Sequence, residues 1–338
     1  MNDISMEGFS KKGNWYKGNL HCHSTNSDGK LSPKEIADLY KQNGYSFLCF
    51  SDHDIYTDYR REFDGEDFII LPGLEASVNL FDESGKHRQK VHHIHGILGT
   101  AEMQEKAEKQ FAHLERRKVK NYFGNWDGKK AAQELCDEMR SYGMITTYNH
   151  PIWSRVSYPE FSDLEGIWAL EIFNYNTVNE SNTGYDEVYW DEMLRNGKKM
   201  LAFASDDNHN EGVFDDACGG YIVVKSDCLD REEIIRNMLK GNYYSSSGVA
   251  IEDWGIKNGV AYVKCENVYR IDFIVGNCVN DGISLMSKTR NNELTYGEYR
   301  LKGHETYIRV KCSDIYGRTA WSNPIYLDRN NDKMGHSV

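Results

Sequence analysis

The chain has 338 residues, of which 39% are hydrophobic and 27% charged, and its formal net charge is −12 at pH 7. This composition is typical of a folded globular protein, and the negative charge argues against binding of long nucleic acids through phosphate contacts. The sequence contains no run of 18 apolar residues, so we expect no membrane-spanning helix.

The first residues, MNDISMEGFSKKGNWYKGNL, lack an apolar core of signal-peptide length. The eight cysteines are scattered and include no CxxC pair. We therefore expect reduced thiols and a cytoplasmic protein.

From about residue 15 to 245, short apolar runs alternate with helical patterns. We expect strands at Leu20–Cys22, Phe47–Phe50, Phe68–Leu71, Ile94–Leu98, Met144–Tyr148, Ile167–Phe173, Met200–Ala204 and Tyr221–Val224. We expect helices from Ser32 to Asn43 and at Ala101–Lys120, Lys129–Tyr142, Tyr185–Asn196 and Asp230–Lys240. Ser32, Pro33 and Glu35 mark the first helix start with a capping box. This alternation predicts an α/β fold with a parallel sheet, open or closed into a barrel.

The pattern changes near Gly248. Short alternating runs separated by turn formers follow at Ala261–Cys265, Arg270–Val275, Tyr307–Cys312 and Pro324–Leu327. They predict a small antiparallel β-sandwich. The expected division is a barrel over residues 1–248, a β-sandwich over 249–328 and a tail over 329–338.

Histidine and acidic residues follow the predicted strands at several separate points. His21 and His23 lie two residues apart at the end of the first strand, so their side chains face the same way. Strand carboxyl ends converge on one face of a parallel barrel, and enzyme active sites lie there. The other segments that bring such residues to this face are Ser51–Asp54, Pro72–Glu75, Val91–Gly96, Asn149–Pro151 and Ser205–His209.

Imidazole and carboxylate ligands without cysteine favour Zn²⁺, Fe²⁺ or Mn²⁺. One Zn²⁺ needs three or four protein ligands, and this chain offers about nine candidates, which is enough for two or three divalent ions. Adjacent cations of this kind generate hydroxide at neutral pH and stabilise a phosphoryl displacement.

The motif order HxH…D, DH, E, H, HP, DxH resembles the PHP (polymerase and histidinol phosphatase) family of metal-dependent phosphoesterases, over about residues 15 to 245. The resemblance implies a distorted (β/α)7 TIM-like barrel with a di- or trinuclear metal centre. It also implies that His21 and His23 hold one ion and that Glu75 bridges to a second ion, which His150 binds. Asp28 and His53 would then bind a third ion.

Two further ligand positions follow from the family spacing. In Val91–Gly96 that spacing selects His93, with His92 and His95 as alternatives. In Ser205–His209 the family pattern Asp-x-His selects Asp207 with His209, and Asp206 is the alternative. The stretch from Tyr307 to Ile325 resembles the β-domain that accompanies some PHP phosphoesterases.

The resemblance predicts hydrolysis of a small phosphomonoester, of the nucleotide or sugar-phosphate class, by a metal-bound hydroxide. Arg155 is expected to bind the substrate phosphate, and His209 or Asp54 to protonate the leaving group. Glu171 is a candidate outer partner or pocket acid. The alternatives are a metal- or ligand-binding barrel without catalytic activity that acts through its β-domain, and an amidohydrolase-like enzyme for a C–N or lactone bond. The sequence does not distinguish a monomer from a homo-oligomer.

Overall fold

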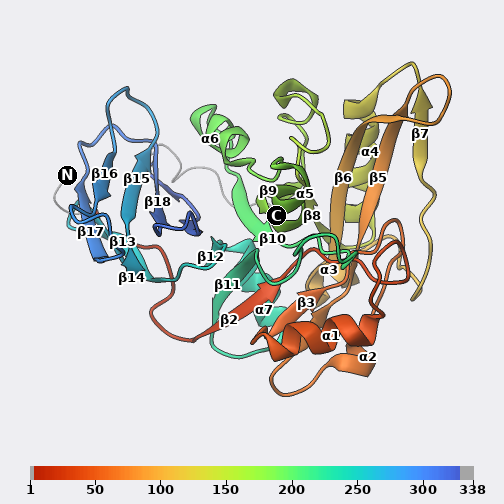
Figure 1. The fold of residues 1–338 in the computed structure, drawn as a ribbon, viewed down its shortest axis with the longest axis horizontal. Coiled ribbons are helices and arrows are strands. Elements are labelled where there is room, and N and C mark those ends of the chain that lie inside the picture. The colour runs from red at the N-terminus through yellow and green to blue at the C-terminus, as the bar shows by residue number, and fades with distance from the viewer. Residues whose placement is uncertain (1–3, 328–338) are drawn as a thin grey trace.

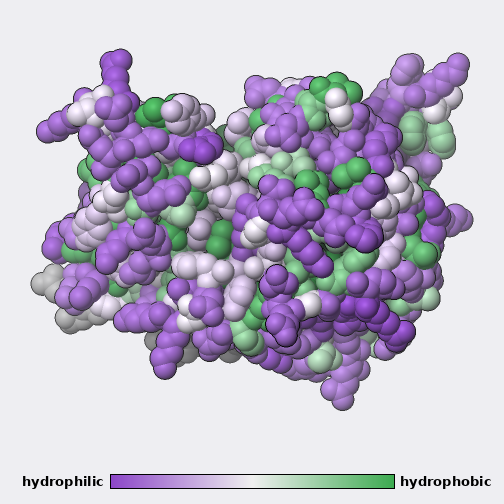
Figure 2. All heavy atoms as spheres, turned by 60° about the horizontal axis from the view of Figure 1, so that its bottom comes forward, coloured by the Kyte–Doolittle hydropathy of each residue, from purple (hydrophilic) through white to green (hydrophobic). Residues whose placement is uncertain are grey.

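The computed structural model describes residues 4–327, which form a mixed α/β protein with many strands and few helices. In Figure 1 the strands β13–β18, in blue, lie at the left, and most helices lie at the right. The predicted tail, 329–338, and residue 328 lie outside the described residues. In residues 4–327 no helix has the length and apolar character that a membrane crossing requires. The face in Figure 2 is mainly hydrophilic, with small hydrophobic areas.

A six-stranded sheet contributes residues to the cavity of the candidate site. Its order is β10 (Leu201–Ser205), β9 (Ile167–Asn174), β8 (Met144–Tyr148), β6 (Arg88–Leu98), β5 (Gly73–Phe81) and β7 (Lys120–Phe123). β8, β9 and β10 are parallel, but β6 runs antiparallel to both β5 and β8. The prediction of a parallel sheet is therefore wrong here. The connection of β5 to β6, residues 82–87, is too short for a crossover helix and makes a hairpin instead.

A second sheet has ten strands and runs through both predicted domains. Its order is β16 (Ile283–Met286), β15 (Arg270–Val275), β18 (Tyr307–Ser313), β19 (Thr319–Ser322), β12 (Tyr243–Ser246), β11 (Tyr221–Ser226), β2 (Asn14–Asn19), β3 (Phe47–Cys49) and β4 (Ile69–Leu71), with β20 (Ile325–Tyr326) beside β18. β2, β3 and β4 are parallel, as predicted. β12 pairs with β19, so hydrogen bonding continues across residue 248, and the domain division there stays a prediction.

The third sheet is antiparallel and contains β1 (Met6–Glu7), β13 (Ile251–Lys257), β14 (Val260–Val268) and β17 (Leu294–Arg300). It shares one hydrophobic core with β15 and β18, in which Trp254, Val263, Ile271 and Val310 are buried. The antiparallel strands predicted after Gly248 are thus confirmed. Sequence reasoning missed β13 and β17, and also β1, because a strand of two residues has no periodic pattern.

The helices cover the outer faces of the sheets. They are α1 (Pro33–Gln42), α2 (Arg60–Phe63), α3 (Ala101–Glu105), α4 (Gly128–Ser141), α5 (Tyr175–Ser181), α6 (Glu187–Arg195) and α7 (Arg231–Leu239), with a 3-10 turn at Tyr158–Glu160. The predicted capping box is confirmed. The Ser32 hydroxyl accepts from the Glu35 amide, and the Glu35 carboxylate accepts from the Ser32 amide at 2.8 Å. α1 buries Ile36 and Tyr40 in a core that it shares with β3 and β4.

The predicted helix Ala101–Lys120 is wrong beyond Glu105. Met103, Ala107, Phe111 and Leu114 recur at helical spacing, but hydrogen bonds to residues 54–57 override this local preference. Residues 106–119 instead form an irregular segment that hydrogen-bonds with residues 54–57. The Arg117 amide donates to the Asp54 carbonyl at 2.6 Å, and the Tyr56 amide donates to the Glu115 carbonyl at 3.0 Å. α5, which precedes α6, was not predicted.

Candidate metal centre

The predicted ligands converge because the two large sheets meet at their strand ends. One single-residue bridge joins Cys22, after β2, to Asn208, after β10. A second joins His53, after β3, to Glu75 in β5. These bridges place the histidines after β2 and β3 opposite the acidic residues of the other sheet. They also explain why segments far apart in sequence form one site.

The first ligand set consists of four buried side chains, His21, His23, Glu75 and Asp207. The Nε2 atoms of the two histidines lie 3.1 Å apart, and each lies within 3.0 Å of the same Asp207 oxygen, Oδ1. The Glu75 carboxylate lies 3.3 Å from His21 Nε2 and 3.6 Å from His23 Nε2. Four potential ligand atoms thus surround one point.

The second set shares Glu75 with the first. Its carboxylate lies 3.1 Å from His53 Nδ1, 3.2 Å from His93 Nδ1 and 3.4 Å from His150 Nε2. His93 and His150 also face each other, with 3.4 Å between ring nitrogens. Because both oxygens of Glu75 meet histidines of both sets, this carboxylate has the position of a bridging ligand.

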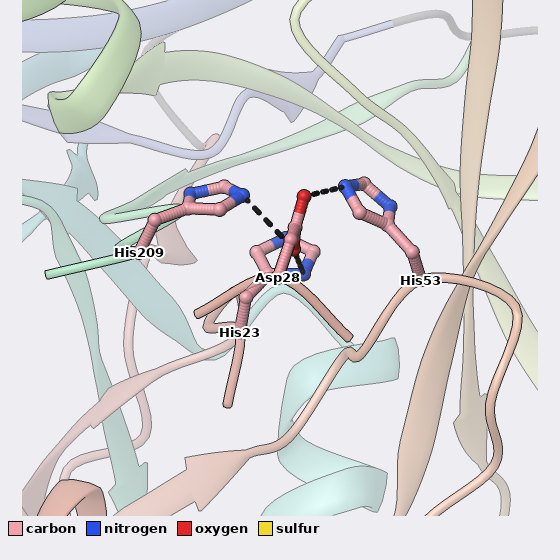
Figure 3. Close-up of side chains that lie close together, drawn as sticks. All are labelled: His23, Asp28, His53 and His209. Carbon is pink, nitrogen blue, oxygen red and sulfur yellow. Dashed lines mark ion pairs between the residues drawn. The ribbon is translucent and has the colours of Figure 1, made fainter. Parts of the chain in front are cut away.

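The third set is built around Asp28, which is the most exposed of these side chains at 53%. Figure 3 shows the Asp28 carboxylate between three imidazoles. Its oxygens lie 3.4 Å from His209 Nε2, 3.6 Å from His53 Nε2 and 3.8 Å from His23 Nδ1. This set opens toward solvent, whereas the first set is closed.

The pKa values of the site residues are set by burial and by the short distances between carboxylates and imidazoles. Despite the burial of Glu75, which alone would raise its pKa, the nearby His93 and His21 hold this pKa well below its usual range. Burial and the neighbouring His53 and His209 lower the pKa of His23 to about 4. Burial also lowers the pKa of His93 to about 3. Burial alone would lower the pKa values of His21, His53 and His150, but the nearby carboxylates raise them, so metal ions that bind there would displace protons.

The donor set fits divalent cations. His21 Nε2 and His23 Nε2 point at each other and at a carboxylate, so at least one of the two nitrogens presents a lone pair rather than a proton. His93 Nε2 and one Glu75 oxygen, Oε2, are buried without a hydrogen-bond partner within residues 4–327. Buried polar atoms of this kind are normally satisfied, and a bound cation is one way to satisfy them.

Surrounding polar groups orient the ligands. The Glu171 carboxylate accepts from His21 Nδ1 at 2.9 Å and from the His150 amide at 3.0 Å. Asn149 donates to Glu75 at 2.9 Å, and Asn174 donates to Asp207 at 3.0 Å. Sequence reasoning named Glu171 only as one of several candidates. Its position near the end of β9, between two ligand strands, was the available signal.

The structure separates the alternative residues by what they contact. Asp206 points away from the histidines and accepts from the Tyr40 hydroxyl and from three successive amides, of residues 218–220, at 2.6–2.8 Å. His92 bonds the Tyr148 hydroxyl at 2.6 Å and stacks on Trp126. His95 is fully buried behind His21, and its Nε2 is 3.8 Å from Glu75. Asp207 and His93 are thus the members of each group that lie closest to the other ligands.

The remaining predicted residues lie in different surroundings. Asp54 lines the cavity, accepts from the Ser77 amide at 3.1 Å and pairs with buried Arg117 at 3.2 Å. Arg155 is exposed and does not line the cavity. The turn after His150 takes Arg155 into the left-handed region, at φ 59°, and away from the ligands. The geometry therefore gives no support to phosphate binding by Arg155.

Three site residues other than glycine have positive φ values: 55° at Asp54, 25° at His150 and 57° at Asp207. This conformation is costly for residues with a side chain and recurs where function requires a particular orientation. Two of these residues are predicted metal ligands. Local strain thus coincides with the candidate site.

The ligand sets open into a cavity of 540 Å³. Its lining residues come from β5, β6, β7, α5 and the segments that follow β2, β3, β8 and β10, together with Val119 before β7. Among these lining residues, Arg88 is the one lysine or arginine. Six others are acidic: Asp28, Asp54, Glu75, Glu180, Asp207 and Glu211. Sequence reasoning missed Arg88 because it lies outside every predicted strand, between Phe68–Leu71 and Ile94–Leu98.

No protein-family model matches the chain. The DNA polymerase/3'-5' exonuclease PolX of Bacillus subtilis (strain 168) is 33% identical over 79 residues. That match covers 18% of this chain and 14% of PolX, so the chain spans a small part of this curated relative.

Solved structures similar to the chain include a two-domain protein from Bacteroides vulgatus, described as containing a predicted PHP-like metal-dependent phosphoesterase. It is 12% identical with a TM-score of 0.44, and 96% of this chain and 97% of that chain are covered. A predicted metal-dependent phosphoesterase from Bifidobacterium adolescentis is 12% identical, with a TM-score of 0.41 and coverage of 68% and 97%. An amidohydrolase from Chromobacterium violaceum, with bound sulfate and no metal, is 16% identical, with a TM-score of 0.36 and coverage of 67% and 96%.

Proposed function

We propose that the protein is a metal-dependent phosphoric ester hydrolase that acts on a small phosphomonoester of the nucleotide or sugar-phosphate class. The observation that carries this proposal is the convergence of three ligand sets, linked through the shared carboxylate of Glu75 and the shared imidazoles of His23 and His53, at the floor of one cavity. A neighbouring group of ions of this kind suits phosphoryl chemistry, because several positive charges can stabilise one phosphate. Seven strands drawn from the two large sheets would then form the distorted barrel typical of the PHP family.

The residues that would hold the ions are the nine predicted from the sequence. The first ion would be bound by His21, His23, Glu75 and Asp207, the second by Glu75, His93 and His150, and the third by Asp28, His53 and His209. Zn²⁺, Fe²⁺ or Mn²⁺ bound there would supply Lewis acidity and lower the pKa of a coordinated water molecule.

The chain's own residues then orient the ligands and transfer a proton. Glu171 fixes the proton of His21 on Nδ1, so that Nε2 is free to bind a cation. Asp54 lines the cavity, and burial raises the pKa of its carboxyl, although Ser77 and Arg117 oppose this. We propose Asp54 as the group that protonates the leaving oxygen, because His209 cannot donate a proton from a nitrogen that binds an ion. Burial disfavours the charged imidazole of His209, but the hydrogen bond to Asp28 prevails and raises its pKa to about 9.

Metal content and phosphate release test this proposal together. The purified protein should contain two or three divalent ions per chain and release phosphate from phosphomonoesters when Mn²⁺ or Zn²⁺ is present. Asp28→Ala and His53→Ala should lose most of this activity while keeping the fold. Absence of bound metal together with release no faster than in these variants would refute the proposal. Bound metal without release would favour the alternative of a metal-binding protein without catalytic activity.

A further inference from the structure

Arg88 belongs to the cavity because of an irregularity in β6. On β5, Glu75, Ser77, Asn79 and Phe81 alternate with the other face and all line the cavity. The register of β6 shifts between the pairs Leu80–Lys90 and Phe81–Arg88, which leaves one extra residue in β6. Paired residues share a face, so this bulge turns Arg88 rather than its neighbour toward the cavity.

The guanidinium of Arg88 lies at the outer end of the cavity and is separated from the ligands by one indole ring. The carbon Cζ of Arg88 lies 5.1 Å from the centre of the Trp153 ring. The same ring lies 5.1 Å from the His150 ring and 5.9 Å from the His93 ring. Trp153 is held in place because its Nε1 donates to Glu180 at 2.7 Å. The indole therefore sets a fixed spacing between the ligand histidines and the guanidinium.

Two polar groups in this outer part have nothing to bind within the described chain. Arg88 forms no hydrogen bond or ion pair with any side chain of residues 4–327, although Asp28, Glu75 and Glu180 also line the cavity. Asn79 is only 7% exposed, lines the cavity, and its Oδ1 has no hydrogen-bond partner in the described structure. Its amide can present either oxygen or nitrogen to a ligand. A buried amide with an unpartnered oxygen and an unpaired guanidinium, both lining one cavity, are groups that can bind a polar ligand.

We propose that Arg88, with Trp153 and Asn79, binds a second anionic group of the substrate, remote from the phosphate that is hydrolysed. This inference rests on the proposed function and specifies its substrate as a phosphomonoester whose other end carries a carboxylate or a second phosphate. The guanidinium is suited to such a group because it forms two parallel hydrogen bonds to an oxyanion while it stacks on the indole. In this reading Arg88 determines specificity, and the metal ions bind the reacting phosphate.

Substrates of equal chain length test the proposal. We would measure kcat/KM of the metal-loaded protein for alkyl phosphates that end in a carboxylate, a second phosphate or a methyl group. We expect the wild type to prefer one or both anionic ends about 10- to 100-fold over methyl, mainly through KM. The two anionic arms show which oxyanion the site accepts.

The variants identify the residue responsible. Arg88→Ala should remove this preference and leave kcat/KM for the methyl substrate within about twofold of wild type, and Arg88→Lys should keep part of the preference. Arg155→Ala, an exposed arginine outside the cavity, is the matched control and should keep the full preference. Equal loss of activity on all three substrates in Arg88→Ala would mean that Arg88 binds the reacting phosphate and would overturn the proposal. So would a wild type with no preference.

A binding measurement separates this proposal from the proposed function. Phosphonopropionate and propylphosphonate cannot be hydrolysed and differ in their anionic end, so calorimetric titration compares their affinities without turnover. Tighter binding of phosphonopropionate to wild type than to Arg88→Ala would support the second anion site even if no phosphomonoester were cleaved. Equal affinities of both compounds for both proteins would refute the site even in an active enzyme.

Discussion

Replacement of Glu171 by glutamine tests how far the metal centre depends on a residue that binds no ion. The two oxygens of Glu171 contact different groups. Oε1 faces His21 Nδ1 and the Ser205 hydroxyl, and Oε2 accepts from the His150 amide and from Asn174. Glutamine has one oxygen and one NH₂ group, so in either orientation it sets a donor against two existing donors.

The expected consequence is a loss of metal affinity. If the NH₂ group faces His21, the imidazole must present a lone pair at Nδ1 and carry its proton on Nε2, the atom that faces His23 and Asp207. If it faces the His150 amide, the backbone of a second ligand is displaced. Loss of such supporting contacts typically weakens metal binding about 10- to 100-fold, or about 1.4–2.8 kcal/mol.

Competition with a chelating dye measures this change directly, and phosphate release at increasing metal concentration measures it through activity. Glu171→Gln should need more metal for half-maximal activity and approach the wild-type rate at saturation. Glu187→Gln is the matched control, since Glu187 contacts Arg309, Lys311 and Trp321 and no predicted ligand. Unchanged metal affinity in a folded Glu171→Gln protein would show that His21 does not depend on Glu171.

Two other predictions concern the paired aspartates and the contact between α6 and β18. Asp207→Asn should lose bound metal and activity. Asp206→Asn should retain metal but unfold at a lower temperature, because the substitution disturbs the hydrogen bonds of residue 206 with Tyr40 and three amides. Metal analysis and calorimetry separate these outcomes. Burial opposes ionisation of Glu187, but Arg309 and Lys311 lower its pKa to about 2 from 4.5. Its contribution, about 3 kcal/mol, is therefore present above pH 4.5 and lost as pH falls toward 2, so urea unfolding of wild type and Glu187→Gln should converge over that range. A stability difference that does not change between pH 7 and pH 3 would contradict this reasoning.

The positions of the ligand residues were predictable because they depend on strand ends. His21 and His23 follow an apolar run with the two-residue spacing of a strand, and in the structure their Nε2 atoms meet at 3.1 Å. The strand predicted at Leu20–Cys22 is wrong: β2 spans Asn14–Asn19 and ends before it, and Cys22 forms only a single-residue bridge. His21 and His23 still face the other ligands, because the bridge between Cys22 and Asn208 continues the strand direction through both histidines.

Other features needed information that short sequence patterns do not contain. The turn of Arg88 toward the cavity depends on one extra residue in β6, and a bulge leaves no mark in the alternation of polar and apolar residues. The irregular segment that brings Arg117 to Asp54 has helix-forming residues, but tertiary hydrogen bonds to residues 54–57 override their local preference. Both cases depend on a partner that is distant in sequence.

The charge of the cavity makes metal ions a condition for substrate binding as well as for chemistry. Among the described lining residues, six carboxylates face one guanidinium, that of Arg88, so the protein alone repels a phosphate group. Two or three divalent ions add four to six positive charges at the ligand sets and reverse the sign of the local field.

Chelation should therefore weaken the binding of propylphosphonate by more than about tenfold, and raised salt should not restore the affinity, because these charges lie within a few ångströms of the ligand. The metal-free Arg88→Ala protein should bind no more tightly than metal-free wild type. Calorimetric titration before and after chelation checks both points. Equal affinity for the phosphonate with and without metal would show that the ions do not contact the phosphate, and the assignment of this cavity as the substrate site would then be wrong.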